Sequence, residues 1–182
     1  GDNPIRIQSM TTTNTNDTEA CVRQAEEIIK AGGELVRFTT QGSREAENMK
    51  NINAGIRADG YQTPLVADVH FNPNVADVAA LYCEKVRINP GNYVDPARKF
   101  IKQEYTDEEY AHELKKIEER FVPFLNICKE NHTAIRIGVN HGSLSDRIRN
   151  RYGDTPERIV ESCLDFLRSS KKENFREVVL SF

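Results

Sequence analysis

Long apolar segments are missing from this sequence, in which no run approaches the roughly 18 apolar residues that a membrane span needs. A strong excess of charge of one sign is missing too, since the formal net charge is −3 at pH 7. These absences argue against a nucleic-acid partner, a membrane partner and an acidic disordered tail. Residues Gly1 to Pro4 form no signal peptide and include no initiator methionine. We therefore expect a cytoplasmic chain that is part of a longer protein.

Closely spaced cysteines are also absent. Cys21, Cys83, Cys128 and Cys163 lie far apart in the sequence, so no CxxC or ferredoxin-like spacing exists. Each cysteine falls in an apolar helical pattern, where a free thiol behaves as a small buried hydrophobe. We expect no metal ligands within this chain, so an iron–sulfur or zinc site would need ligands from outside it.

What the sequence does contain is a β-strand followed by an α-helix, repeated along the chain. The connection between residues 93 and 133 is longer than the others and rich in lysine and glutamate. Its apolar stripe predicts a helix that Pro123 kinks or splits, preceded by a loop at 93–106 within an insertion of about 93–110. Strands are expected at 5–10, 35–40, 64–70, 86–88, 134–140 and 176–182, and the other helices at about 17–32, 43–58, 73–81 and from about 156.

This repeat predicts a parallel sheet covered by helices, which either a doubly wound sheet or a TIM barrel would provide. No G-x-G-x-x-G follows the first strand, and polar residues lie in or just after most strands, so the barrel is favoured. A complete (β/α)8 barrel has eight units in about 250 residues. We therefore predict an α/β fold in which residues 1–182 form one truncated TIM-barrel domain of about six β/α units.

Charged and polar residues interrupt the apolar pattern of four predicted strands at matching positions. The alternate residues of the same strands are apolar, so the polar set would face a barrel lumen and the apolar set would pack under the helices. The residues that share the polar face are Arg37 with Thr39, Asp68 with His70, Arg87 with Asn89, and Arg136 with Asn140.

Three arginines near one mouth of a barrel suit a diphosphate, because the guanidinium fork matches phosphate oxygens. Internal ion pairs are the alternative, since Asp68, Glu34 or Glu84 could neutralise an arginine. Because three arginines face a single acid in register, the diphosphate interpretation is favoured. Asp68 and His70 could share a metal ion, but hydrogen bonds from them to ligand hydroxyls fit equally well. By position they are also the candidates for acid–base catalysis, and no catalytic triad can be argued from spacing.

The chain resembles hydroxymethylbutenyl diphosphate synthases, the iron–sulfur enzymes of the methylerythritol phosphate route to isoprenoids, over essentially its whole length. The resemblance rests on IQSMT at 7–11, LVR at 35–37, LVADVHF at 65–71, RINPGN at 87–92 and IRIGVNHGSL at 135–144. It implies a TIM barrel that binds 2-C-methyl-D-erythritol 2,4-cyclodiphosphate, and the long 93–133 connection resembles the form of the family that carries insertions.

The same resemblance implies roles for particular residues and for parts outside this chain. Arg37, Arg87 and Arg136 match the family's diphosphate-binding arginines, and Asn140 matches a substrate-contacting asparagine. Asp68, His70 and Asn89, which the strand pattern rather than the resemblance indicates, complete the expected substrate-binding set. A separate C-terminal domain is expected to hold a [4Fe-4S] cluster through three cysteines and one glutamate, and ferredoxin or flavodoxin to supply electrons for reductive ring opening and dehydration.

The whole protein is therefore expected to be an iron–sulfur oxidoreductase and a homo-oligomer. The family's substrate lysine and acid–base glutamate would lie beyond Phe182, so this piece alone is expected to be inactive. Two other interpretations stay open. One is a phosphate-binding barrel with aldol or pterin chemistry and no cluster, for which the only strand lysine is Lys85, away from the mouth. The other is a non-catalytic binding fragment. The open sheet edges predict self-association or poor stability.

Overall fold

The sheet consists of six parallel strands, and each strand pairs with the next one along the chain. The computed structural model describes residues 2–94 and 104–182. A strand order that follows the sequence belongs to a barrel wall, because a doubly wound sheet reverses its order in the middle. The predicted truncated barrel is therefore confirmed. The strands are β1 (Gln8–Met10), β2 (Leu35–Thr40), β3 (Leu65–Val69), β4 (Lys85–Ile88), β5 (Ala134–Gly138) and β6 (Val178–Ser181).

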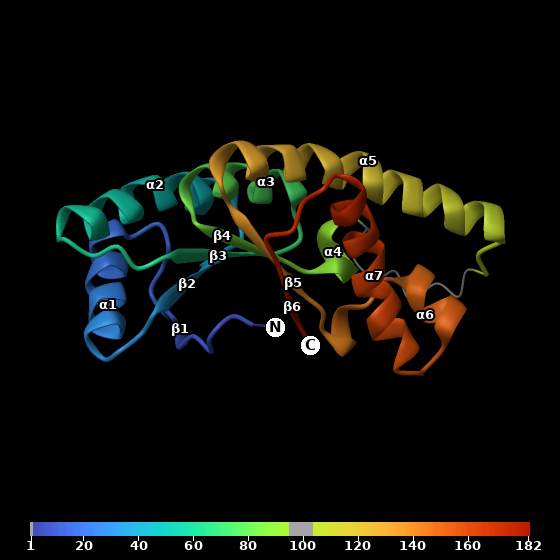
Figure 1. The fold of residues 1–182 in the computed structure, drawn as a ribbon, viewed down its shortest axis with the longest axis horizontal. Helices are drawn as coiled ribbons and strands as arrows, with labels where there is room; N and C mark the ends of the chain where they lie inside the picture. Colours follow the sequence, from blue (N-terminus) through green and yellow to red (C-terminus); the bar gives the residue numbers. More distant parts are fainter. Residues whose placement is uncertain (1, 95–103) are drawn as a thin grey trace.

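The helices form an arch over one face of the curled sheet, and the other face is open (Figure 1). Both ends of the chain lie on the open side, away from α2, α3 and α5. None of the helices in residues 2–94 and 104–182 is long and apolar enough to cross a membrane. The helices are α1 (Thr18–Lys30), α2 (Ser43–Ala58), α3 (Pro73–Tyr82), α4 (Pro90–Tyr93), α5 (Asp107–Asn131), α6 (Asp146–Tyr152) and α7 (Glu157–Lys172), with a short 3-10 turn, η1 (His141–Ser143).

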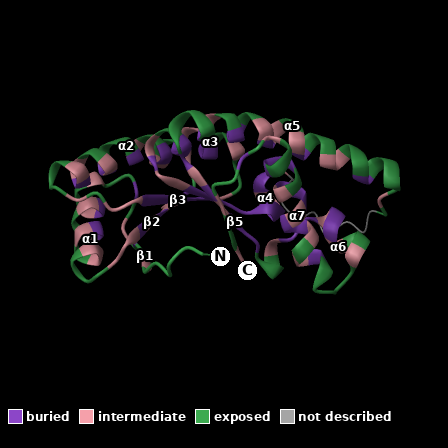
Figure 2. Cartoon of the chain, in the orientation of Figure 1, coloured by how far each residue is buried: buried purple, intermediate pink, exposed green. Residues whose placement is uncertain are grey.

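The hydrophobic core lies between the sheet and the arch of helices. It is lined by the alternate, apolar residues of the strands, as the sequence predicts. Among them are Val36, Phe38, Val86 and Ile135, which are fully buried. Figure 2 shows β3 buried along its length while the outer side of α5 is largely exposed. The four cysteines are free and buried, as their helical patterns predict.

Several element ends differ from the predicted ones by a few residues. The first strand begins only at Gln8, because Ile5 has no neighbouring strand to pack on and is 96% exposed. The fifth strand ends at Gly138, so Asn140 lies in the following loop. The second helix starts at Ser43 as predicted, but its N-cap is Gly42, whose N–H donates to Glu45 at 3.2 Å.

Pro123 does not split α5, which corrects one of the two effects predicted for it. The helix runs continuously for 25 residues. The proline side chain is exposed, so the carbonyl that it leaves without a helical partner can face water. Phe121, Phe124 and Leu125 are fully buried on the other side of the helix, and their packing holds both halves of the helix against the core.

The predicted insertion at 93–110 is only partly covered by the structure. Residues 95–103 lie outside the described residues, Tyr93 ends the unpredicted helix α4, and residues 107–110 form the first turn of α5. Thr106 caps that turn, because its hydroxyl accepts a hydrogen bond from Glu109 N at 3.2 Å while the Glu109 carboxylate accepts one from Thr106 N at 2.8 Å.

Strands β1 and β6 form the two edges of the sheet, since each pairs with only one neighbour. Apolar side chains are exposed at both edges, among them Met10, Val179 and Leu180. The predicted open edges are therefore present, and the self-association that they favour stays a prediction.

Candidate functional site

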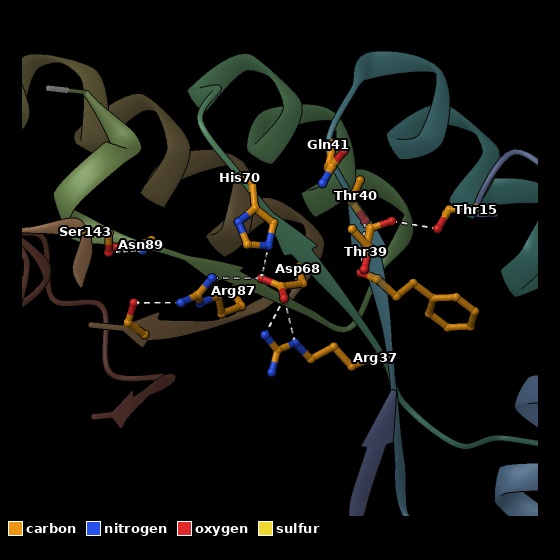
Figure 3. A network of polar contacts seen from close by, with 12 residues as sticks. Thr15, Arg37, Thr39, Thr40, Gln41, Asp68, His70, Arg87, Asn89 and Ser143 are labelled. Atoms are coloured by element: carbon orange, nitrogen blue, oxygen red, sulfur yellow. Dashed lines mark hydrogen bonds and ion pairs between the residues drawn. The ribbon is translucent and has the colours of Figure 1, made fainter. Parts of the chain in front are cut away.

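Polar side chains from four adjacent strands lie in one row on the open face of the sheet. The parallel register pairs Thr39 with Asp68, Asp68 with Arg87, and Arg87 with Arg136. Paired residues of neighbouring strands point to the same side, so this register brings the four side chains to one level. Arg37 lies two residues before Thr39 on β2, and its side chain reaches the carboxylate of Asp68 (Figure 3).

Asp68 is the hub of this row. Its Oδ2 accepts a hydrogen bond from Arg37 Nε at 2.9 Å and a second from Arg37 Nη2. Its Oδ1 lies 3.1 Å from Arg87 Nη1 and 3.3 Å from His70 Nε2. The side chain is 2% exposed. Burial by itself would raise the pKa of Asp68, but the hydrogen bonds from His70 and Arg37 and the charge of Arg87 outweigh it and hold the pKa at about 2.

Arg87 is held from a second side as well. Its Nη2 donates to the Gly138 carbonyl at 3.0 Å, and the residue is 5% exposed. The internal ion pairs considered from the sequence are therefore real for Arg37 and Arg87. Two other acids named as possible partners are engaged elsewhere: Glu34 pairs with Arg6 at 2.7 Å, and Glu84 pairs with Arg57 at 2.9 Å.

Arg136 differs from the other two arginines. Its Nε donates to the Ser181 hydroxyl at 3.0 Å, and within residues 2–94 and 104–182 no carboxylate pairs with it. Burial lowers the pKa of Arg136, and the neighbouring charges of Arg37 and Arg87 lower it further. The site thus holds three guanidinium groups against one carboxylate, which leaves a net positive charge on the open face.

Asn89 and Asn140 are both predicted to bind the ligand, and the structure buries Asn89 but leaves Asn140 exposed. Asn89 is buried and caps α4, where its Oδ1 accepts from Gly91 N at 3.0 Å and its Nδ2 donates to Ser143 Oγ at 2.7 Å. Asn140 is exposed in the loop after β5, and its carbonyl accepts from the Ser143 hydroxyl at 3.3 Å. Sequence reasoning missed Ser143, although a Gly-Ser pair just after a strand marks a loop that could position such a hydroxyl.

His70 and Phe71 follow β3 at the same end of the sheet. The His70 side chain is partly exposed beside Asp68, and its ring centroid lies 5.8 Å from that of Phe71. Phe71 has a φ of 62°, a left-handed conformation that a bulky residue rarely adopts. This strained backbone turns the chain away from the strand directly after His70.

The donor atoms of residues 2–94 and 104–182 do not form a site for a metal ion or cluster. Among the described residues no three histidine, cysteine or acidic side chains gather in one place. Arg37 and Arg87 already neutralise Asp68, so a cation shared by Asp68 and His70 is disfavoured. An iron–sulfur cluster therefore does not fit the residues that surround this site.

Two hollows of about 660 and 430 Å³ lie near the last strand: the larger is lined by residues that precede β5 and β6, and the smaller by residues of α7 and β6. Thr133 and Arg176 line the larger hollow, and Leu167 and Leu180 line the smaller one. Neither hollow includes an arginine of the row around Asp68.

The fold and this site together define a class of protein: a parallel β/α-barrel domain whose lumen side carries an arginine-rich, positively charged site. More narrowly, the chain belongs to the GcpE TIM-barrel domain family, because a model of that family matches residues 1–182.

Relatives from other organisms are similar over the whole chain. A protein of Phocaeicola vulgatus is 75% identical over 181 residues, which are 100% of this chain and 30% of that protein. A protein of Akkermansia muciniphila is 51% identical over 100% of this chain and 31% of its own length. Both are named 4-hydroxy-3-methylbut-2-en-1-yl diphosphate synthase (flavodoxin). The chain spans about a third of the length of these relatives.

Solved structures with a similar fold share little sequence with the chain. A truncated 3-deoxy-D-arabino-heptulosonate 7-phosphate synthase from Thermotoga maritima has a TM-score of 0.55 at 11% identity, covering 96% of this chain and 50% of its own. The β-methylaspartase of Clostridium tetanomorphum has a TM-score of 0.54 at 13% identity, covering 91% of this chain and 33% of its own. At such low identity the likeness concerns the fold alone.

Proposed function

We propose that this chain is the substrate-binding barrel of a 4-hydroxy-3-methylbut-2-en-1-yl diphosphate synthase. The full enzyme would reductively open and dehydrate 2-C-methyl-D-erythritol 2,4-cyclodiphosphate in isoprenoid biosynthesis. Membership of the GcpE TIM-barrel family and the names of relatives up to 75% identical support this proposal. The observation that carries it is the row of Arg37, Arg87 and Arg136 around a single ionised carboxylate.

The charge balance of the site suits this substrate. A cyclic diphosphate carries one negative charge on each of its two phosphates. The three guanidinium groups and the Asp68 carboxylate together carry two net positive charges, which balance them. Arg136 would be the main phosphate ligand, because it has no carboxylate partner among the described residues. Arg37 would be the second, since its side chain is partly exposed.

The remaining residues would orient the substrate and its arginines. Asp68 stays ionised at neutral pH, so it can hold Arg37 and Arg87 in place before the substrate arrives. His70 lies at the mouth with one ring nitrogen directed at Asp68, which leaves the other for a ligand hydroxyl. Asn140 would contact the substrate from the β5 side, and Asn89 would act mainly by shaping the mouth through Ser143 and Gly91.

The reductive chemistry would be supplied by a [4Fe-4S] cluster, which the proposal assigns to residues outside this chain. The separately buried thiols of the described residues are unsuited to hold it. The names of the relatives support flavodoxin rather than ferredoxin as the electron donor. We infer further that the 182-residue chain alone does not turn over substrate, and product formed by this piece with a reductant would contradict that inference.

Isothermal titration of the cyclodiphosphate into the full-length protein tests the proposal. We expect Arg136→Ala to weaken binding by about tenfold or more, because a charge-assisted hydrogen bond is lost. Arg168→Ala is the matched control, since Arg168 is an exposed arginine of α7 that pairs with Glu161 away from the row. A wild-type protein that binds no cyclodiphosphate would contradict the proposal and would favour a barrel for another phosphorylated ligand or a non-catalytic role.

A further inference from the structure

The loop that follows β5, residues 139–145 (the β5 loop), is fastened to the β4 side of the site. Asn89 Nδ2 donates to Ser143 Oγ at 2.7 Å. Gly91 lies against the backbone of Ser143 so closely that any Cβ at position 91 would overlap the Ser143 carbonyl oxygen. These contacts hold the loop at Ser143, and at its start the Val139 N–H donates to the Ser181 carbonyl at 2.9 Å. The His141 side chain, between these two points, is contacted from α7.

Arg158, in the first turn of α7, contacts this loop at His141. Its Nη2 lies 2.6 Å from His141 Nε2 and 3.2 Å from His141 Nδ1, while its Nη1 donates to the Gly153 carbonyl at 3.2 Å. It also pairs with the carboxylate of Asp154. A guanidinium group can only donate, so a hydrogen bond between these two side chains needs an accepting ring nitrogen on His141.

Arg158 is an unusual residue to bury for the sake of the helix alone. It is 5% exposed, and its Nε is buried without a hydrogen-bond partner among the described residues. Burying a charged group with an unsatisfied donor is costly. The helix already has other anchors, because Phe166 is buried in the core and Asp165 pairs with Arg147 at 3.0 Å. Arg158 also contacts Gly153 and Asp154 in the turn between α6 and α7, and its contact with His141 links that turn to the β5 loop.

We propose that Arg158 is a positioning residue for the site on the open face. Through His141 it holds the β5 loop next to Asn140, so that Asn140 is presented at the mouth while Asn89 holds the loop through Ser143. This inference rests on the proposed function for its ligand, because Asn140 is a ligand contact only if that function is right. The holding of the loop itself depends on no ligand.

The test uses the full-length protein with four variants. Arg158→Met removes the donor, His141→Leu removes the acceptor at an exposed position that folding tolerates, and His141→Gln keeps an acceptor. Arg168→Met is the control, because Arg168 lies on the same helix and pairs with Glu161 at 3.0 Å, away from the loop. Hydrogen exchange over residues 139–145 reports the loop, and calorimetric titration of the cyclodiphosphate reports the site.

We expect Arg158→Met and His141→Leu to speed exchange in residues 139–145 and to weaken binding by about tenfold, the effect of losing one charge-assisted hydrogen bond. His141→Gln should lie closer to the wild type than His141→Leu, and Arg168→Met should match the wild type in both measurements. A double variant of Arg158→Met and His141→Leu should be no worse than either single one, because both remove the same contact.

Unchanged exchange in both Arg158→Met and His141→Leu would overturn the inference, and so would faster exchange with unchanged binding. If Arg158→Met does not fold, His141→Leu and His141→Gln decide the question. If the wild type binds no cyclodiphosphate, the proposed function fails and the role of Arg158 in binding fails with it. The exchange measurement would still show whether Arg158 holds the loop, so the two failures are distinguishable.

Discussion

The Arg87 side chain reaches diagonally to Gly138 on the neighbouring strand, two residues beyond its register partner Arg136. The Arg87 Nη2 group donates to the Gly138 carbonyl at 3.0 Å, and any Cβ at position 138 would lie closer than 3.0 Å to Arg87 Nε. The absence of a side chain at Gly138 therefore provides the space that the Arg87 guanidinium occupies while it also reaches Asp68. The lack of a side chain at Gly138 on β5 thus determines where the guanidinium group of Arg87, on β4, can lie.

Gly138→Ala should displace Arg87 from this position. Overpacking of a buried site destabilises a protein by about 1–3 kcal/mol, and here the displaced group is also an ion-pair partner of Asp68. We expect a loss in that range in the free energy of unfolding, measured by urea denaturation. Gly142→Ala is the control, because a Cβ at Gly142 meets no atom within 4 Å. Equal stability of the two variants would contradict the prediction.

Asp68→Asn should leave Arg37 and Arg87 partly buried without a counter-charge. Removing one partner of a buried ion pair costs about 3–5 kcal/mol. We expect the variant to lose stability on this scale and to regain part of it when inorganic diphosphate is added, because an anion can replace the carboxylate. Urea denaturation with and without diphosphate measures both effects. A variant as stable as the wild type, with no response to diphosphate, would show that Asp68 is not the counter-charge.

Acid should weaken the wild type through the same residue. The pKa of Asp68 is about 2 in the folded protein against an ordinary value of 3.8, so ionisation of Asp68 favours the folded state. This contribution, roughly 2 kcal/mol, is fully present above about pH 5 and is lost as the pH falls through 3.8 towards 2. The difference in unfolding free energy between wild type and Asp68→Asn should therefore shrink across this window, since other acids titrate in both proteins. If the difference stays constant from pH 5 to pH 2, ionisation of Asp68 does not stabilise the folded state.

Pro123→Ala should stabilise the protein. A proline in a helix interior is about 3 kcal/mol less favourable than alanine, and Pro123 is an exposed residue inside the continuous helix α5. Alanine would restore the N–H that the helix lacks at this position without changing the buried side. We expect a higher melting temperature and a gain of about 1–3 kcal/mol in urea denaturation. A loss of stability would mean that the proline is adapted to a local bend.

Much of the fold follows from local patterns in the sequence. Successive side chains of a strand point to opposite faces of the sheet. The alternation of polar and apolar residues therefore places Arg37, Asp68, Arg87 and Arg136 on one face. The helix at Asp107–Asn131 was predicted from its apolar stripe, but its continuity through Pro123 was not, because the packing of Phe121 and Phe124 decides it. Helix α6 has no sequence signal strong enough to separate it from a loop.

The sequence by itself determined that three arginines and one acid share the open face of a β/α-barrel, since strand periodicity is a local property. Only the tertiary structure decided how the charges are distributed. Asp68 forms ion pairs with Arg37 and Arg87, and Arg136 donates a hydrogen bond to the Ser181 hydroxyl instead. The contact of Arg158 with His141 is likewise invisible in sequence. Pairing of this kind depends on strand register, side-chain reach and the space left by Gly138, which arise only when distant segments pack together.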